Sequence, residues 1–202
     1  MQTASSAPRK GALTRALSAP GTANGLILLG AVLQVLFFIL YLINGDVHVD
    51  EAMLVLNARS LAREGTDIFG QRMPVYFDTW LYGGQSSLAT YLAAAFIRLF
   101  GNQIWIARLP LALTAFASLF ALKGLVRLLL PGQYTVQNIV LLLTAIEPWR
   151  LYQSAWTLDC AYLPFVRLFA LYFLVHAGEK PRARLLFSTC LFYPSARPRA
   201  VR

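Results

Sequence analysis

The sequence predicts an all-α polytopic membrane protein, with about four transmembrane helices and further helices lying on the membrane surface. Hydrophobic residues make up 57% of its 202 residues and charged residues only 13%, about half the charged share of a soluble domain. The uncharged residues also gather in long blocks, the first running without a charge from Gly25 to Ile43. This pattern excludes a disordered chain and an ordinary water-facing domain.

Charge is distributed unevenly along the chain. The net charge is +9, yet six of the nine acidic residues lie between Asp46 and Asp78, where only three basic residues occur. Membrane proteins keep basic loops on the cytoplasmic side. The basic excess therefore predicts cytoplasmic loops rather than nucleic-acid binding, and it places the acidic loop on the opposite side.

Four segments are long enough, or nearly so, to cross a hydrocarbon core of about 30 Å. They span residues 25–43, 104–126, 133–149 and 160–177. With a cytoplasmic N-terminus, this count puts the basic clusters at 123–127 and 180–184 inside, and loop 44–103 and turn 152–159 outside. A cleaved signal peptide is a weaker interpretation of the first segment, because its apolar run is too long. We expect a multi-pass protein of the plasma membrane.

Loop 44–103 is expected to carry two helices at the membrane surface. Residues 49–64 share an apolar face of helical spacing, and Gly65 suits the position that ends the helix. That face comprises Leu54, Val55, Ala58, Leu61 and Ala62. Residues 86–100 repeat the pattern with Leu88, Tyr91, Leu92, Ala95, Phe96 and Leu99. Between them we expect an ordered loop whose aromatic residues suit a membrane interface: Tyr76, Phe77, Trp80 and Tyr82.

The two ends of the chain differ from the rest in composition. Residues 1–24 predict a disordered cytoplasmic leader, and residues 25–187 the membrane module. Beyond Arg184 only nine apolar residues remain, too few to cross a bilayer. The basic segment 188–202 is therefore interpreted as the aberrant tail of a truncated reading frame. Cys160 and Cys190 are expected near opposite faces, so no disulfide framework is predicted.

The sharpest local motif is His48-Val49-Asp50-Glu51, placed just after the first span. One interpretation is helix capping, in which Asp50 accepts backbone hydrogen bonds and Glu51 favours the positive end of the helix dipole. Another is catalysis, with a carboxylate held near the membrane surface as a base toward a hydroxyl group. A metal site formed with His48 is a third, although this ligand spacing is weakly specific.

Other candidates are charged residues at or inside apolar segments, where charge is usually paired or functional. Asp159 follows the third predicted span, on the same side as Asp50. Arg108 and Arg150 lie at helix ends, and Arg167 falls near the middle of the fourth span. Arg167 either pairs with an acid of another helix or binds a phosphate.

The order of several short motifs resembles membrane-embedded glycosyltransferases of the GT-C class. These motifs are HVDEA, GTDIFGQRMPVYFDTW, GGQSSLATYL, LFGNQIWIARLPLAL and PWRLYQSAWTLDCAYLPF. The resemblance covers about residues 25–187, and it is strongest to protein O-mannosyltransferases and to the aminoarabinose transferases of lipid A. Because such enzymes have several hundred residues, it implies that this chain is an N-terminal portion.

The resemblance implies an inverting transfer of a sugar from a polyprenyl-phosphate donor to a lipid, glycan or protein acceptor outside the cytoplasm. Asp50 and Glu51 match the acidic pair that holds the catalytic base, and Asp159 matches a second acidic residue of the site. Arg108, Arg150 and His48 are the substrate-binding candidates, and a divalent cation is left open as the cofactor. At Ala155 the chain departs from the family pattern, which places an arginine there.

Two other classes of function compete with the glycosyltransferase. A transporter fragment would use the acidic loop as a cation vestibule, although the acids cluster outside the spans. A non-catalytic accessory protein would bind a partner through its aromatic loop.

Overall fold

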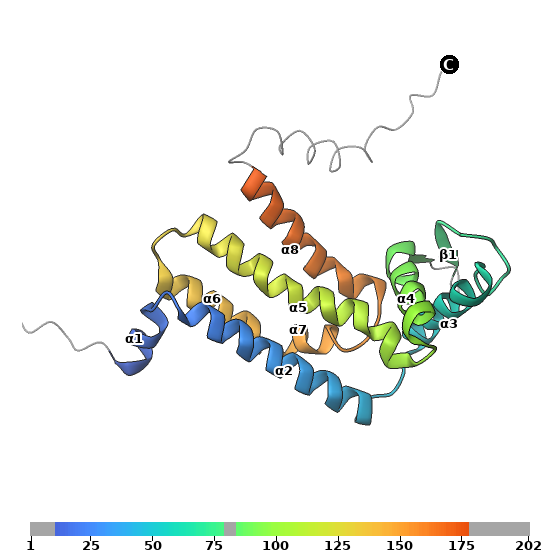
Figure 1. Cartoon of the computed structure of the whole chain (residues 1–202), viewed down its shortest axis with the longest axis horizontal. Coiled ribbons are helices and arrows are strands. Elements are labelled where there is room, and N and C mark those ends of the chain that lie inside the picture. The colour runs from blue at the N-terminus through green and yellow to red at the C-terminus, as the bar shows by residue number, and fades with distance from the viewer. Residues whose placement is uncertain (1–10, 79–83, 178–202) are drawn as a thin grey trace, which may run out of the picture.

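The computed structural model describes residues 11–78 and 84–177 and is mostly helical (Figure 1). Its long helices are α2 (Thr22–Asn44), α5 (Ile104–Leu129) and α8 (Asp159–Ala177). The shorter helices of the bundle are α1 (Ala12–Ser18), α6 (Tyr134–Ile146) and α7 (Pro148–Gln153). At one end of this bundle lie α3 (Val49–Glu64), α4 (Ser87–Phe100) and the strands β1 (Tyr76–Asp78) and β2 (Gly84–Ser86).

Three helices are long and apolar enough to cross a membrane, and they mark the chain as a mostly helical membrane protein. They cover Thr22–Ile43, Ile104–Leu129 and Asp159–Ala177. Each lies within three residues of a predicted span at both ends. Long apolar runs specify such helices well, because every backbone group inside a bilayer must be satisfied within the helix.

The predicted span 133–149 is not one continuous helix. Helix α6 ends at Ile146 after 13 residues, and α7 begins at Pro148. Between them Glu147 adopts an extended conformation, as expected before a proline. Its carboxylate accepts hydrogen bonds from the backbone amides of Trp149, at 3.0 Å, and Arg150. Pro148 and this cap break the expected span, so the prediction of four continuous spans is corrected to three within the described residues.

Part of the predicted disordered leader is helical. Helix α1 lies within it, and α2 begins before it was expected to end. The Asn138 side chain of α6 explains this order, because its Nδ2 donates to the carbonyl oxygens of Leu17, at 2.7 Å, and Ala19, at 3.1 Å. Residues 1–10 and the predicted tail 188–202 lie outside the described residues.

Small residues allow the helices of the bundle to approach closely. Helix α2 packs against α5 and α6, and α5 packs against α8. A Cβ atom at Gly30 would come within 3.1 Å of the Ala145 Cβ and 3.0 Å of the Leu119 Cδ1. At Gly124 it would come within 2.4 Å of the Tyr172 ring. Such contacts are typical of helices that associate within a membrane.

Helices α3 and α4 differ from their predicted faces. Helix α3 buries most of the expected stripe, and it also buries Met53 and Asn57. The burial of polar Asn57 is accommodated because its Oδ1 accepts the backbone amide of Ile68 at 3.2 Å. Helix α4 buries its smaller side chains rather than the predicted face: Ala89, Thr90, Ala93, Ala94 and Ile97. The larger residues Leu88 and Leu99 are exposed, where they suit contact with lipid.

The loop between α3 and α4 is ordered, as expected, but it contains a hairpin that the sequence did not predict. Strands β1 and β2 pair antiparallel, with Phe77 opposite Gln85. Asp67 is buried and its Oδ1 accepts the amides of Phe69 and Gln71, at 3.0 and 2.8 Å. Phe77 is fully buried and Tyr76 is exposed, so Phe77 is not the interfacial residue that was expected. Trp80 and Tyr82 lie outside the described residues.

Candidate active site

A buried ion pair lies at the end of the bundle that carries α3 and α4. The Arg108 Nε and Nη2 atoms donate to Glu51 Oε1 and Oε2, each at 2.7 Å. Glu51 is completely buried, and Arg108 is 2% exposed. This two-bond geometry matches the planar guanidinium to the carboxylate and is the strong form of such a pair.

Further contacts connect this pair to two other segments. The Thr157 backbone amide, just before α8, donates to Glu51 Oε1 at 2.9 Å. The Arg108 guanidinium lies over the ring of Tyr41 near the end of α2, 4.8 Å from its centroid, which is close enough for a cation–π interaction. Residues from α2, α3, α5 and the approach to α8 are thereby fixed to one another. Glu51, predicted as part of a catalytic pair, is fully engaged by these contacts.

Asp50, next to Glu51, faces outward. The predicted cap is wrong, because His48 caps the helix: its Nδ1 accepts the Asp50 backbone amide at 3.3 Å. The Asp50 carboxylate is 64% exposed and lies 3.5 Å from His48 Nδ1. Two adjacent carboxylates therefore have different environments, with Glu51 buried in an ion pair and Asp50 accessible.

Strand β2 connects Asp50 to the third acidic candidate, Asp159. The Gln85 side chain donates to the backbone carbonyl of Asp50 at 2.9 Å. The next residue, Ser86, donates its backbone amide to Asp159 Oδ2, also at 2.9 Å. The structure thus brings the starts of α3 and α8 to consecutive residues of one strand.

A small cavity of about 110 Å³ opens beside Asp159, between α4 and α8. Its walls include Ser86 and Tyr162. The Tyr162 hydroxyl is buried and lies near the Thr157 side chain. Ser86 and Asp159 are the polar residues in an otherwise largely apolar lining.

Arg150 lies elsewhere, beside the middle of α2. Its Nη2 donates to Gln34 Oε1, at 2.9 Å, and to the carbonyl of Ala115, at 3.0 Å. Nε and Nη1 are buried without a partner among the described residues. The structure therefore does not group Arg150 with Asp50. Arg167 is exposed on the surface of α8.

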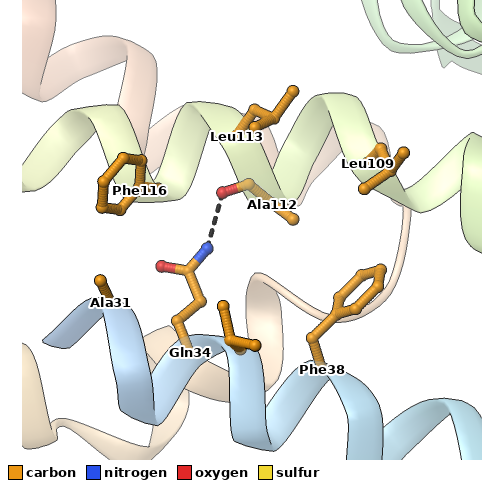
Figure 2. A pocket seen from close by; sticks show the side chains of 8 residues that line it. Ala31, Gln34, Phe38, Leu109, Ala112, Leu113 and Phe116 are labelled. Carbon is orange, nitrogen blue, oxygen red and sulfur yellow. Dashed lines mark hydrogen bonds between the residues drawn. The ribbon is translucent and has the colours of Figure 1, made fainter.

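Gln34 also borders an apolar groove between α2 and α5, shown in Figure 2. The groove has a volume of about 290 Å³. Figure 2 shows Gln34 reaching across to α5, where its Nε2 donates to the Ala112 carbonyl at 2.6 Å. The remaining walls are apolar: Ala31, Val35, Phe38, Leu109, Leu113 and Phe116.

Aromatic residues next to the acidic candidates were missed by the sequence analysis. Tyr152 contacts Tyr41, Trp149 and Trp156, with ring centroids 5.9, 5.6 and 5.2 Å away. Trp156 in turn meets the ring of His48 at 5.3 Å. The spacing of residues 149, 152 and 156 gave a weak signal of a shared helical face, but it could not reveal contact with residues about a hundred positions earlier.

The third interpretation of the His48 motif, a metal site, has no support in this geometry. Glu51 is directed to Arg108, and the nitrogen of His48 nearest Asp50 caps the helix. Among residues 11–78 and 84–177, no group of three His, Cys, Asp or Glu side chains lies close enough to hold a metal ion.

In comparisons with known proteins, no family model, no curated protein and no solved structure matches the chain.

Proposed function

We propose that the chain belongs to a glycosyltransferase that transfers a sugar from a polyprenyl-phosphate donor to an acceptor outside the cytoplasm. The observation that carries the proposal is the environment of Asp50. It is an accessible carboxylate at one end of the bundle, and its helix is anchored by the buried Glu51–Arg108 pair. A base must be accessible to its substrate and held in position.

In this proposal the two members of the acidic pair have different roles. Asp50 removes the proton of the acceptor hydroxyl while the oxygen of that hydroxyl attacks the anomeric carbon of the sugar. The bond from that carbon to the carrier phosphate breaks, and the polyprenyl phosphate leaves with the electron pair. Glu51 and Arg108 are positioning residues, because each is occupied by the other. Asp159, which is hydrogen-bonded to the same strand as Asp50, would orient the acceptor.

The apolar groove between α2 and α5 supports a lipid-linked donor. Its walls are almost entirely hydrocarbon and both of its helices are long enough to span the bilayer. An isoprenoid chain would gain the free energy of packing against this surface. Because Arg108 is bound to Glu51 within the protein, this proposal gives it no role at the leaving phosphate.

The proposal is tested with membranes that contain the chain and a panel of radiolabelled polyprenyl-phosphate sugars. We expect Asp50→Asn to lower transfer by roughly 10²–10⁴-fold, the usual contribution of a general base, without loss of donor binding. Asp46→Asn is the matched control, since Asp46 is also an exposed acid at this end of the bundle. Unchanged transfer by Asp50→Asn, or an equal loss in Asp46→Asn, would contradict the role of Asp50.

A non-catalytic membrane accessory protein is the second candidate, and one observation favours it. Glu51 is bound in a structural ion pair with Arg108. One of the two acids of the Asp50–Glu51 pair therefore has an explanation that does not involve catalysis. This candidate predicts no transfer with any donor, together with normal folding of Asp50→Asn.

A further inference from the structure

We propose that the end of the bundle opposite the candidate active site binds the phosphate headgroup of an anionic phospholipid. The site is a hollow of about 360 Å³ between the α1–α2 link and the α5–α6 turn. It is lined by Pro20, Arg127, Pro131, Gly132, Tyr134 and Gln137.

The charge of this end favours an anion. Its charged residues among those described are Arg15 on α1 and Lys123 and Arg127 on the last turns of α5. None of the acids among the described residues lies on α1, α5 or the turn between α5 and α6. Lys123 and Arg127 are four residues apart, so they lie on one face of α5. Lys123 donates to Asn24. Arg127 is exposed and lines the hollow.

The hollow also presents hydrogen-bond donors besides Arg127. Helix α6 begins at Tyr134 with no side chain capping its N-terminus. The first amides of a helix lack partners within the helix and carry a partial positive charge. Tyr134, the first residue of this helix, lines the hollow together with Arg127, whose planar guanidinium suits the oxygens of a phosphate.

The position of the hollow selects a lipid as the source of the phosphate. It lies where α5 ends, at Leu129, which is the level of the headgroups if α5 crosses the bilayer. Leu129 and Val136, on either side of the turn, are 56% and 42% exposed, so they can contact acyl chains. Basic pockets between helices at this level are a recurrent mode of binding for anionic headgroups.

The structure of the hollow is fixed by contacts beneath it. Gln137 is buried, and its Nε2 donates to the Leu130 carbonyl at 2.6 Å. Gly132 has a φ of 77°, which gives the turn a conformation that other residues rarely adopt. The hollow is therefore formed before any ligand arrives, which lowers the cost of binding.

The test uses the purified full chain in detergent and counts bound lipids by native mass spectrometry. Phosphatidylglycerol and phosphatidylcholine of equal chain length are supplied at equal concentration. We expect tighter binding of phosphatidylglycerol, and a loss of about fivefold in Arg127→Gln, the effect of one basic residue near an anionic surface. Arg127→Lys should retain most of the preference.

Arg63→Gln is the matched control, because Arg63 is an exposed arginine on α3 at the other end of the molecule. The proposal fails if the two lipids bind equally, if Arg127→Gln keeps the full preference, or if Arg63→Gln loses as much. It also fails if inorganic phosphate displaces phosphatidylglycerol at equal concentration, since the site would then take a free anion.

Discussion

At the scale of single residues, the most consequential feature is the difference between Asp50 and Glu51. Burying a charge is costly unless it is paired and hydrogen-bonded. Glu51 meets both conditions through Arg108 and the Thr157 amide. Asp50 remains in contact with solvent. Two adjacent residues of one helix thus supply a structural carboxylate, Glu51, and a carboxylate that is available for chemistry, Asp50.

Glu51→Gln should destabilise the protein by about 3–5 kcal/mol, because it leaves Arg108 as a buried charge without its partner. Thermal unfolding in detergent, followed by circular dichroism, measures the effect. Glu64→Gln is the control, since Glu64 is an exposed acid on the same helix. If both variants unfolded at the same temperature, the ion pair would not support the fold as described.

The Glu51–Arg108 pair was not predictable from the sequence. Both residues were selected as candidates, since charge near apolar segments is usually paired or functional. Nothing in their spacing showed that they meet, because they are 57 positions apart. The exposure of Asp50 likewise could not be predicted, because it depends on which face of α3 packs against the bundle. A shift of that face by one residue would bury Asp50 and expose Glu51.

At the scale of elements, the bundle depends on glycine at the contact between α2 and α6. Gly30→Leu should destabilise the protein by about 1–3 kcal/mol, because its side chain would overlap Ala145 and Leu119. Gly25→Leu on the same helix is the control, since a Cβ at Gly25 meets nothing within 4 Å. Comparable unfolding temperatures for the two variants would show that α2 and α6 are not closely packed.

Elements were predicted well where one strong local signal decides the structure. The long apolar runs located α2, α5 and α8 to within three residues. The break at Glu147 and Pro148 was missed because the surrounding apolar run outweighed the proline signal. The buried face of α4 was wrong because small residues, rather than the largest apolar ones, pack against α3 and α5.

At the scale of the whole molecule, the two ends of the bundle differ in chemistry. Asp50 and Asp159 lie at one end, and Lys123 and Arg127 lie on the last turns of α5 at the other. If α5 spans the bilayer, the acidic end faces the outside and the basic end the cytoplasm, by the positive-inside rule.

Cys160 gives a direct test of this orientation, because it is an exposed free thiol next to Asp159. In a Cys190→Ser variant, a membrane-impermeant maleimide should label Cys160 in intact cells. Labelling only after the cells are lysed would place Asp159 in the cytoplasm and remove it from an extracytoplasmic site.

The central claim is that a polyprenyl-linked sugar binds at the acidic end of the bundle. It is tested most directly by a polyprenyl-phosphate sugar that carries a photoreactive diazirine on the sugar ring, cross-linked to the chain in membranes and mapped by mass spectrometry. We predict cross-links within residues 46–51, 84–89 and 156–163, which excess unlabelled donor should suppress. Cross-links confined to other segments, or labelling that unlabelled donor does not reduce, would contradict the claim.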